Sequence, residues 1–91
     1  MDSEQFITEL EARLTSLAPE MIPGLLKKQL ENVDATKESL TPEKAKEFVD
    51  NVAKALELFI GPDGSKNARK LMLRKLRQSC STDELEKIMM Q

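Results

Sequence analysis

The chain has 91 residues, of which 40% are hydrophobic and 33% are charged, and its formal net charge is −2. This length predicts a single domain over residues 1–91, and the balance of apolar and charged residues excludes a disordered chain. The single cysteine excludes an internal disulfide. No stretch approaches the roughly 20 apolar residues of a membrane span, and the first residues are acidic where a secretion signal is basic. We therefore expect a cytoplasmic protein that makes no membrane contact.

The first expected helix covers residues 3–18. Ser3 is its expected N-cap, and Pro19 ends it because the residue before a proline is pushed out of the α region. Apolar residues recur in steps of three and four, which predicts one buried stripe. The stripe consists of Phe6, Ile7, Leu10, Leu14 and Leu17.

A second helix is expected to begin near Pro23, which suits a first helical turn because its missing N–H is not needed there. Gly24 leaves the starting residue open by several positions. The helix is expected to bury one stripe that contains Leu26, Leu30 and Val33.

The third expected helix, residues 41–60, has the clearest signals. Thr41 is its expected N-cap, and Pro42 occupies the first helical position. Gly61 fits the position just after the helix, and Pro62 is a normal stop. A wide apolar stripe is typical of a central core helix. That stripe consists of Ala45, Phe48, Val49, Val52, Ala53, Leu56, Phe59 and Ile60.

A tight turn over residues 61–64 is expected to lead to a fourth helix capped by Ser65. Its apolar positions run towards Cys80 with helical spacing. They are Ala68, Leu71, Met72 and Leu76.

A short fifth helix is predicted because Ser81 and Glu84 have the spacing of a capping box. Its apolar face, formed by Leu85, Ile88 and Met89, either covers the chain's own core or meets a partner. Together these elements predict an all-α fold, a compact bundle of four to five short helices. The bundle is either a monomer or a subunit of an intertwined dimer.

The residue types argue against catalysis. There is no histidine, which removes Ser-His-Asp and Cys-His catalysis and most zinc and copper sites. Cys80 falls on an apolar stripe and is interpreted as a structural residue. The carboxylates follow polar helix positions, and the glycines before Ser65 lack the spacing of a phosphate loop. We predict a protein that is not an enzyme and has no cofactor or metal site.

The strongest local feature is a basic helix, residues 65–79, with six positive charges and no acid between residues 64 and 82. At about 3.6 residues per turn, four of these charges share one side, Arg69 lies at its margin, and Lys75 falls on the apolar side. The four, candidates for binding an anion or a partner, are Lys66, Lys70, Arg74 and Arg77. They could face nucleic-acid phosphates, an acidic protein surface such as that of a second copy, or acids of the same chain.

Charge is distributed unevenly along the chain. Residues 1–40 contain eight acids and four bases, whereas residues 62–91 contain four acids and seven bases. The basic helix has no aromatic residue for stacking on single-stranded bases, and the isoelectric point of 5.2 lies below that of a typical nucleic-acid module.

We therefore predict a small non-catalytic interaction or regulatory protein that acts through helix–helix contacts. Its expected partner is a protein, namely a second copy of itself in a homodimer, and the expected apolar interface is Leu85, Ile88 and Met89. The alternative is a nucleic-acid-binding regulator that uses the basic helix 65–79.

Overall fold

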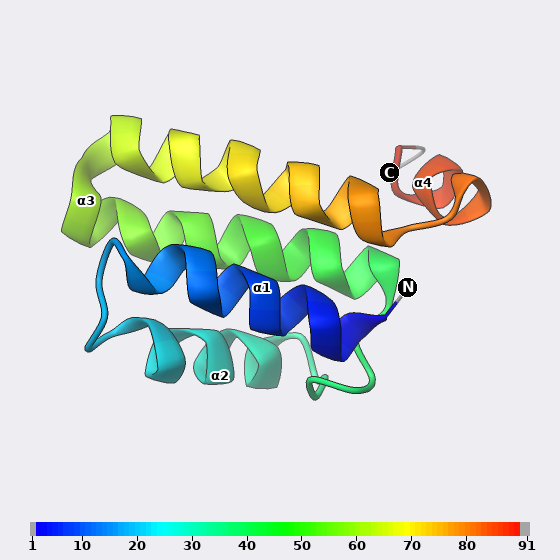
Figure 1. Ribbon diagram of the computed structural model, residues 1–91, viewed down its shortest axis with the longest axis horizontal. Coiled ribbons are helices and arrows are strands. Elements are labelled where there is room, and N and C mark those ends of the chain that lie inside the picture. The colour runs from blue at the N-terminus through cyan, green and yellow to red at the C-terminus, as the bar shows by residue number, and fades with distance from the viewer. Residues whose placement is uncertain (1, 90–91) are drawn as a thin grey trace.

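The computed structural model describes residues 2–89, of which Leu85, Lys87, Ile88 and Met89 are described for the backbone alone. Four helices follow one another along the chain (Figure 1): α1 (Ser3–Thr15), α2 (Ile22–Asn32), α3 (Pro42–Ser79) and α4 (Thr82–Met89). Residues 2–89 contain no strand, so the predicted all-α fold is confirmed. None of the helices in this range has both the length and the apolar character that crossing a membrane requires.

The longest element, α3, is a hairpin of two helical arms. At Gly61 the backbone leaves the helical region (φ 80°, ψ 170°), and the chain turns back there. Glycine adopts this conformation without steric cost, and Pro62 then supplies the fixed φ of a first helical turn. The prediction that Gly61 and Pro62 separate two helices is confirmed. We call residues 42–60 the first arm and residues 62–79 the second arm.

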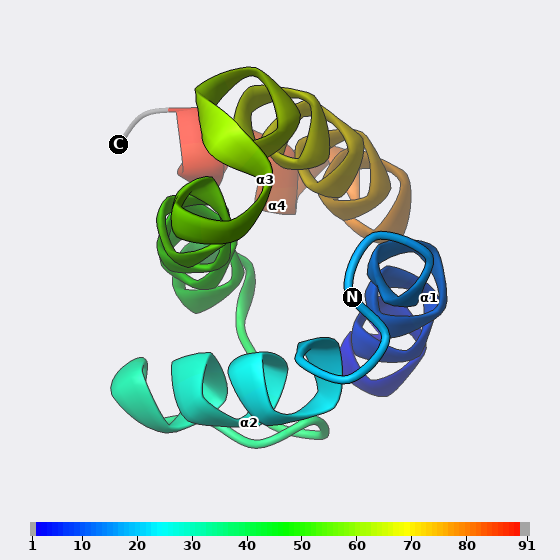
Figure 2. The same cartoon turned by 90° about the vertical axis from the view of Figure 1, so that its left-hand side faces the viewer.

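Seen from its end, the molecule is a bundle whose four sides are α1, α2 and the two arms of α3 (Figure 2). α1 and α2 pack on each other and on α3, while α4 packs against α3. α2 lies opposite the second arm, across the core. Aliphatic side chains dominate this core, and burying each contributes about 1.5–3 kcal/mol. Core residues include Phe6, Ile7, Leu10, Leu14, Ile22, Leu26, Phe48, Val49, Val52, Leu56, Met72 and Leu76.

Two predicted helix caps are confirmed. The Thr41 hydroxyl oxygen accepts a hydrogen bond from the Lys44 N–H at the start of α3 (3.3 Å). Before α4, the Ser81 N–H donates to the Glu84 carboxylate (2.9 Å), and the Glu84 N–H donates to the Ser81 hydroxyl (3.3 Å). The second pair is the reciprocal capping box expected from its spacing.

The predicted cap at Ser3 is wrong. The Asp2 carboxylate accepts from the Gln5 N–H and caps α1 (3.1 Å). Ser3 is instead buried within α1, and its hydroxyl donates to the backbone carbonyl of Lys37 (2.6 Å). A buried hydroxyl must find an acceptor, and the acceptor here lies in the loop that joins α2 to α3.

The predicted cap at Ser65 is also wrong, and the turn that precedes it is shorter than expected. Residues 62–64 already belong to the second arm, so Ser65 lies inside a helix. It is buried, and its hydroxyl donates to the carbonyl oxygen of Ala53 in the first arm (2.5 Å). This hydrogen bond joins the two arms close to the hairpin turn.

Two residues predicted to lie in the core, Leu17 and Phe59, are exposed, with 49% and 62% of their surface accessible. α1 ends at Thr15, and the hairpin end of α3 extends beyond both α1 and α2 (Figure 1). The apolar stripes of α1 and of the first arm therefore continue past the last complete layer of the core. Helical periodicity identifies the helix face on which a residue lies, but it does not show where the neighbouring helix ends.

Candidate functional site

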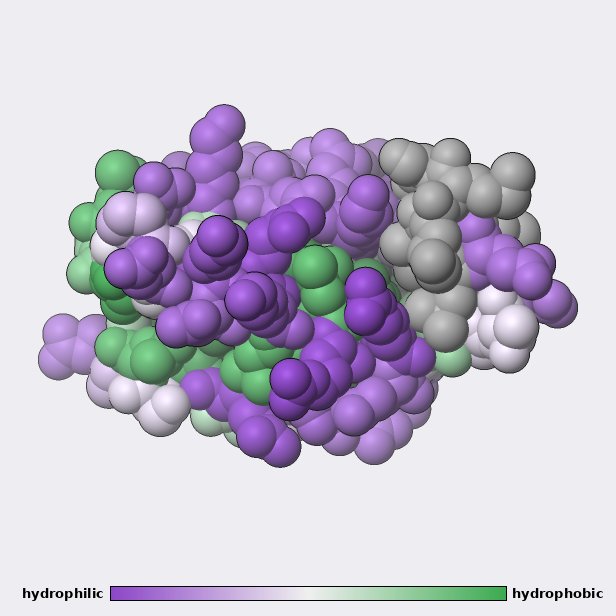
Figure 3. Space-filling view, turned by 90° about the horizontal axis from the view of Figure 1, so that it is seen from above, coloured by the Kyte–Doolittle hydropathy of each residue, from purple (hydrophilic) through white to green (hydrophobic). Residues whose placement is uncertain are grey.

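The four basic residues predicted to share one side of their helix do form a continuous line. Lys66, Lys70, Arg74 and Arg77 are all exposed on the second arm of α3. From the first to the last, the line covers about 16 Å at about 1.5 Å per residue. Figure 3 looks down on the bundle from the side where the second arm lies, and hydrophilic side chains cover most of this face. We call these four residues the basic ridge.

The two other bases of this helix pair with acids of the same chain. Arg69 contacts Asp50 of the first arm (Nε–Oδ1 2.9 Å), and Lys75 contacts Glu9 of α1 (Nζ–Oε2 4.0 Å). Only 17% of the Lys75 side chain is exposed, as expected for a lysine whose stem lies along the apolar side of its helix.

The basic ridge differs from these flanking bases. Among residues 2–89, no carboxylate lies within 4.0 Å of the charged group of any ridge residue. Asp63, in the first turn of the second arm, is exposed and begins the same face of the helix. Pairing within the chain therefore accounts for the two flanking bases but not for the ridge.

A second exposed surface lies where the hairpin of α3 extends beyond the other helices. Leu58 is 85% exposed and is next to Phe59 at the end of the first arm. Leu17 lines a groove of about 420 Å³ together with Ile60 and Leu71, whereas Leu58 lines a different groove between the first arm and α2. Hydrophobic residues gather at this end of the molecule in Figure 3. We call Leu17, Leu58 and Phe59, with the groove that Leu17 lines, the open end.

Gly64 allows the two arms to approach each other beside the open end. A Cβ atom added at Gly64 would lie 3.1 Å from Cβ and Cγ1 of Ile60. That is closer than ordinary van der Waals contact, so a larger residue would displace the Ile60 side chain. Ile60 lines the groove of the open end, and the absence of a side chain at Gly64 therefore helps to shape this groove.

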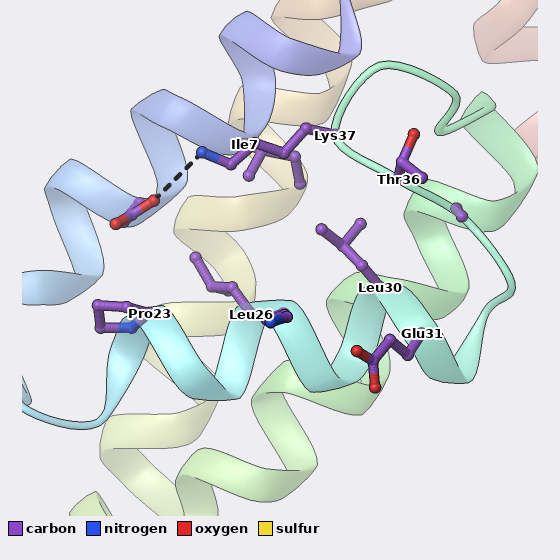
Figure 4. A pocket seen from close by; sticks show the side chains of 10 residues that line it. Ile7, Pro23, Leu26, Leu30, Glu31, Thr36 and Lys37 are labelled. Carbon is purple, nitrogen blue, oxygen red and sulfur yellow. Dashed lines mark ion pairs between the residues drawn. The ribbon is translucent and has the colours of Figure 1, made fainter.

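A separate groove of about 440 Å³ runs between α1 and α2 (Figure 4). Ile7, Leu26 and Leu30 point into it and are almost completely buried, so its floor is the outer edge of the core. Glu11 and Lys37 form an ion pair across it (3.8 Å). The groove is therefore lined by packed apolar side chains, by this ion pair and by the charged residues Lys27 and Glu31.

The described residues hold no group of three or more cysteine, aspartate or glutamate side chains placed to bind a metal ion. Cys80 follows the second arm, is partly buried and packs against the core. Burial raises the pKa of its thiol, and the nearby Glu84 carboxylate adds to the rise. A nucleophilic cysteine requires the opposite, a lowered pKa.

Cys80 is therefore expected to react slowly with a thiol reagent such as iodoacetamide. Because burial and the Glu84 carboxylate raise its pKa, a smaller fraction of the folded thiol is ionised than of a cysteine with an ordinary pKa at the same pH. The rate should increase when urea unfolds the chain, and the measurement is the alkylation rate by mass spectrometry in both states. Faster reaction in the folded state would contradict the structural interpretation of Cys80.

The expected apolar interface lies on α4. The backbone of α4 is helical from Thr82 to Met89 and packs against α3. The side chains of Leu85, Ile88 and Met89 lie outside the described residues. The open end was not predicted, although its signal was present in the sequence, since Phe59 closely precedes the helix break at Gly61. Comparisons with family models, with curated proteins and with solved structures find no match to this chain.

Proposed function

We propose that this chain is a non-catalytic protein-interaction module that binds a second copy of itself through the open end. The observation that supports this most directly is the exposure of Phe59, on a helix face whose other apolar residues form the core, and of Leu17, just beyond the end of α1. Exposed apolar surface of this kind marks interaction sites in small soluble proteins. The chain has three aromatic residues, and Phe59 is the one outside the core. Buried aromatic side chains supply much of the binding energy at protein interfaces.

A second copy suits the open end because both partners of a two-fold dimer use the same surface. Apolar side chains such as Leu58 and Phe59 complement identical side chains without any requirement for opposite charge. Near them, Arg13 lines the groove while Glu57 and Asp63 are exposed. With both signs present, an acid of one copy can face a base of the other.

The test is analytical ultracentrifugation over a range of protein concentrations. The unmodified chain is expected to dimerise, and Leu58→Ser with Phe59→Ser is expected to weaken the dimer at least about 30-fold. That factor corresponds to the loss of about 2 kcal/mol that defines an interface hot spot. Circular dichroism should report unchanged helix content, because both residues are exposed.

Two further variants distinguish the open end from other dimer interfaces. Lys70→Glu with Arg74→Glu tests a contact between the basic ridge and the acidic residues 1–40 of a second copy. Ile88→Ser with Met89→Ser tests the apolar face predicted on α4. Both are expected to leave the dimer intact, and loss of the dimer in either one, with none in the Leu58 and Phe59 variant, would contradict the proposal. A chain that stays monomeric at every concentration would also contradict it.

A further inference from the structure

We propose that the basic ridge binds the phosphate backbone of double-stranded nucleic acid. This inference does not depend on dimerisation through the open end, because the two surfaces share no residue. It begins from the contrast between the ridge and its flanks. Arg69 and Lys75 are paired with acids of the chain, whereas no carboxylate of the described residues pairs with the ridge.

The ridge concentrates like charge on one helix face. Lys66, Lys70 and Arg74 are four residues apart, and Arg77 follows three residues later. Like charges at these spacings are neighbours on the helix surface and repel one another. A bound polyanion would remove this repulsion and would release the counterions condensed on the nucleic acid.

The composition of the ridge favours phosphates over an acidic protein surface. Protein interfaces have an apolar centre from which lysine is depleted, and the outward positions between Asp63 and Arg77 offer only polar or charged exposed side chains. Nucleic-acid interfaces are much more positively charged, and lysine and arginine are their usual phosphate ligands. Each strand of a duplex carries one phosphate per about 3.4 Å of helix axis, so the roughly 16 Å of the ridge spans about five phosphates of the backbone that it follows. The four cations can therefore be neutralised without one fixed alignment of the protein along the duplex.

A duplex fits the ridge better than a single strand does. Proteins that hold single strands combine positive charge with aromatic side chains on which bases stack. The second arm of α3 contains no aromatic residue. Its cations lie along one straight helix edge that can follow a duplex backbone. The expected binding is thus independent of sequence and strongly dependent on salt.

The experiment measures fluorescence anisotropy of a labelled duplex DNA of arbitrary sequence as protein is added, between roughly 50 and 200 mM salt. With four phosphate contacts, the logarithm of the binding constant should fall against the logarithm of salt with a slope of about −3.6. Over that salt range the affinity should fall about 150-fold. A single strand of the same sequence should bind more weakly.

The decisive variant is Lys70→Glu with Arg74→Glu, and its matched control is Lys27→Glu with Lys28→Glu. Each pair changes the net charge by the same amount, and the control pair lies on α2, opposite the second arm (Figure 2). At low salt the ridge variant should bind duplex DNA more than tenfold more weakly, and its salt slope should shrink by about 2. The control should bind within about threefold of the unmodified chain.

Several results would overturn the proposal. The first is the absence of duplex binding at low salt, and the second is an unchanged affinity of the ridge variant for the duplex. The third is equal weakening of binding in the ridge variant and in the control variant, which would mean that only the total charge matters. Polyglutamate provides the remaining comparison. If it competes for the ridge as well as duplex DNA does, the ridge is a docking surface for acidic protein and the assignment to nucleic acid is wrong.

Discussion

Replacing Phe48 by alanine is expected to destabilise the bundle by about 3–5 kcal/mol. Phe48 is completely buried in the first arm of α3 and is one of the two largest side chains in the core. Its loss removes apolar burial and leaves a cavity that the neighbouring helices fill only in part. Since small domains are stable by about 5–15 kcal/mol, this change would remove a large share of the total.

The matched control is Phe59→Ala, the same chemical change at a residue that is 62% exposed. It is expected to cost about 0.5 kcal/mol or less, at protein concentrations low enough to keep the chain monomeric. The measurement is urea unfolding monitored by circular dichroism, because the chain has no tryptophan or tyrosine whose fluorescence could report unfolding. Equal losses in the two variants would mean that Phe59 is as well packed as Phe48, and the open end would not exist.

Gly61→Ala is expected to destabilise the protein by about 1–3 kcal/mol, whereas Gly24→Ala is expected to stabilise it by about 0.5–1 kcal/mol. Beyond the adjacent backbone, a Cβ atom at either glycine would meet no atom within 4 Å, so contacts do not account for the difference. The backbone does. Gly61 has φ 80° and ψ 170°, a region that is essentially restricted to glycine. Gly24 lies in α2, where alanine fits the helix and reduces the freedom of the unfolded chain.

The same unfolding experiment measures both glycine variants, and the opposite signs make the comparison sharp. If Gly61→Ala left stability unchanged, the turn between the arms would not depend on the left-handed conformation at this residue. The hairpin matters for both proposals, because it places the open end at one tip of the molecule and directs the basic ridge away from it along the second arm.

The helices themselves were predictable because their signals are local. Thr41 with Pro42 begins the first arm, Gly61 with Pro62 separates the arms, and each signal acts through backbone geometry within a few residues. The capping box before α4 works in the same way, since its two hydrogen bonds join residues three apart. The alignment of the ridge residues is equally local, because helical periodicity alone brings them to one face.

The tertiary structure decided what each helix face meets. Lys75 is paired because Glu9 of α1 lies beside the second arm, and Arg69 is paired because Asp50 of the first arm faces it. The ridge residues on the same helix have no such neighbour among the described residues. Nothing in the spacing of the six basic residues distinguishes those that form ion pairs from those that do not, since the acidic partners lie on α1 and on the first arm of α3.

Burial at the hairpin end was decided in the same way. Leu17 and Phe59 continue apolar stripes that the sequence by itself establishes, yet both are exposed because α1 and α2 end before the hairpin does. Ser3 and Ser65 have the residue type of an N-cap, yet their buried hydroxyls bond carbonyls of other segments. Sequence determines the helix and its face, because those depend on backbone geometry over a few residues. The relative lengths and positions of neighbouring helices, which arise only on packing, determine whether that face is core, ion pair or open surface.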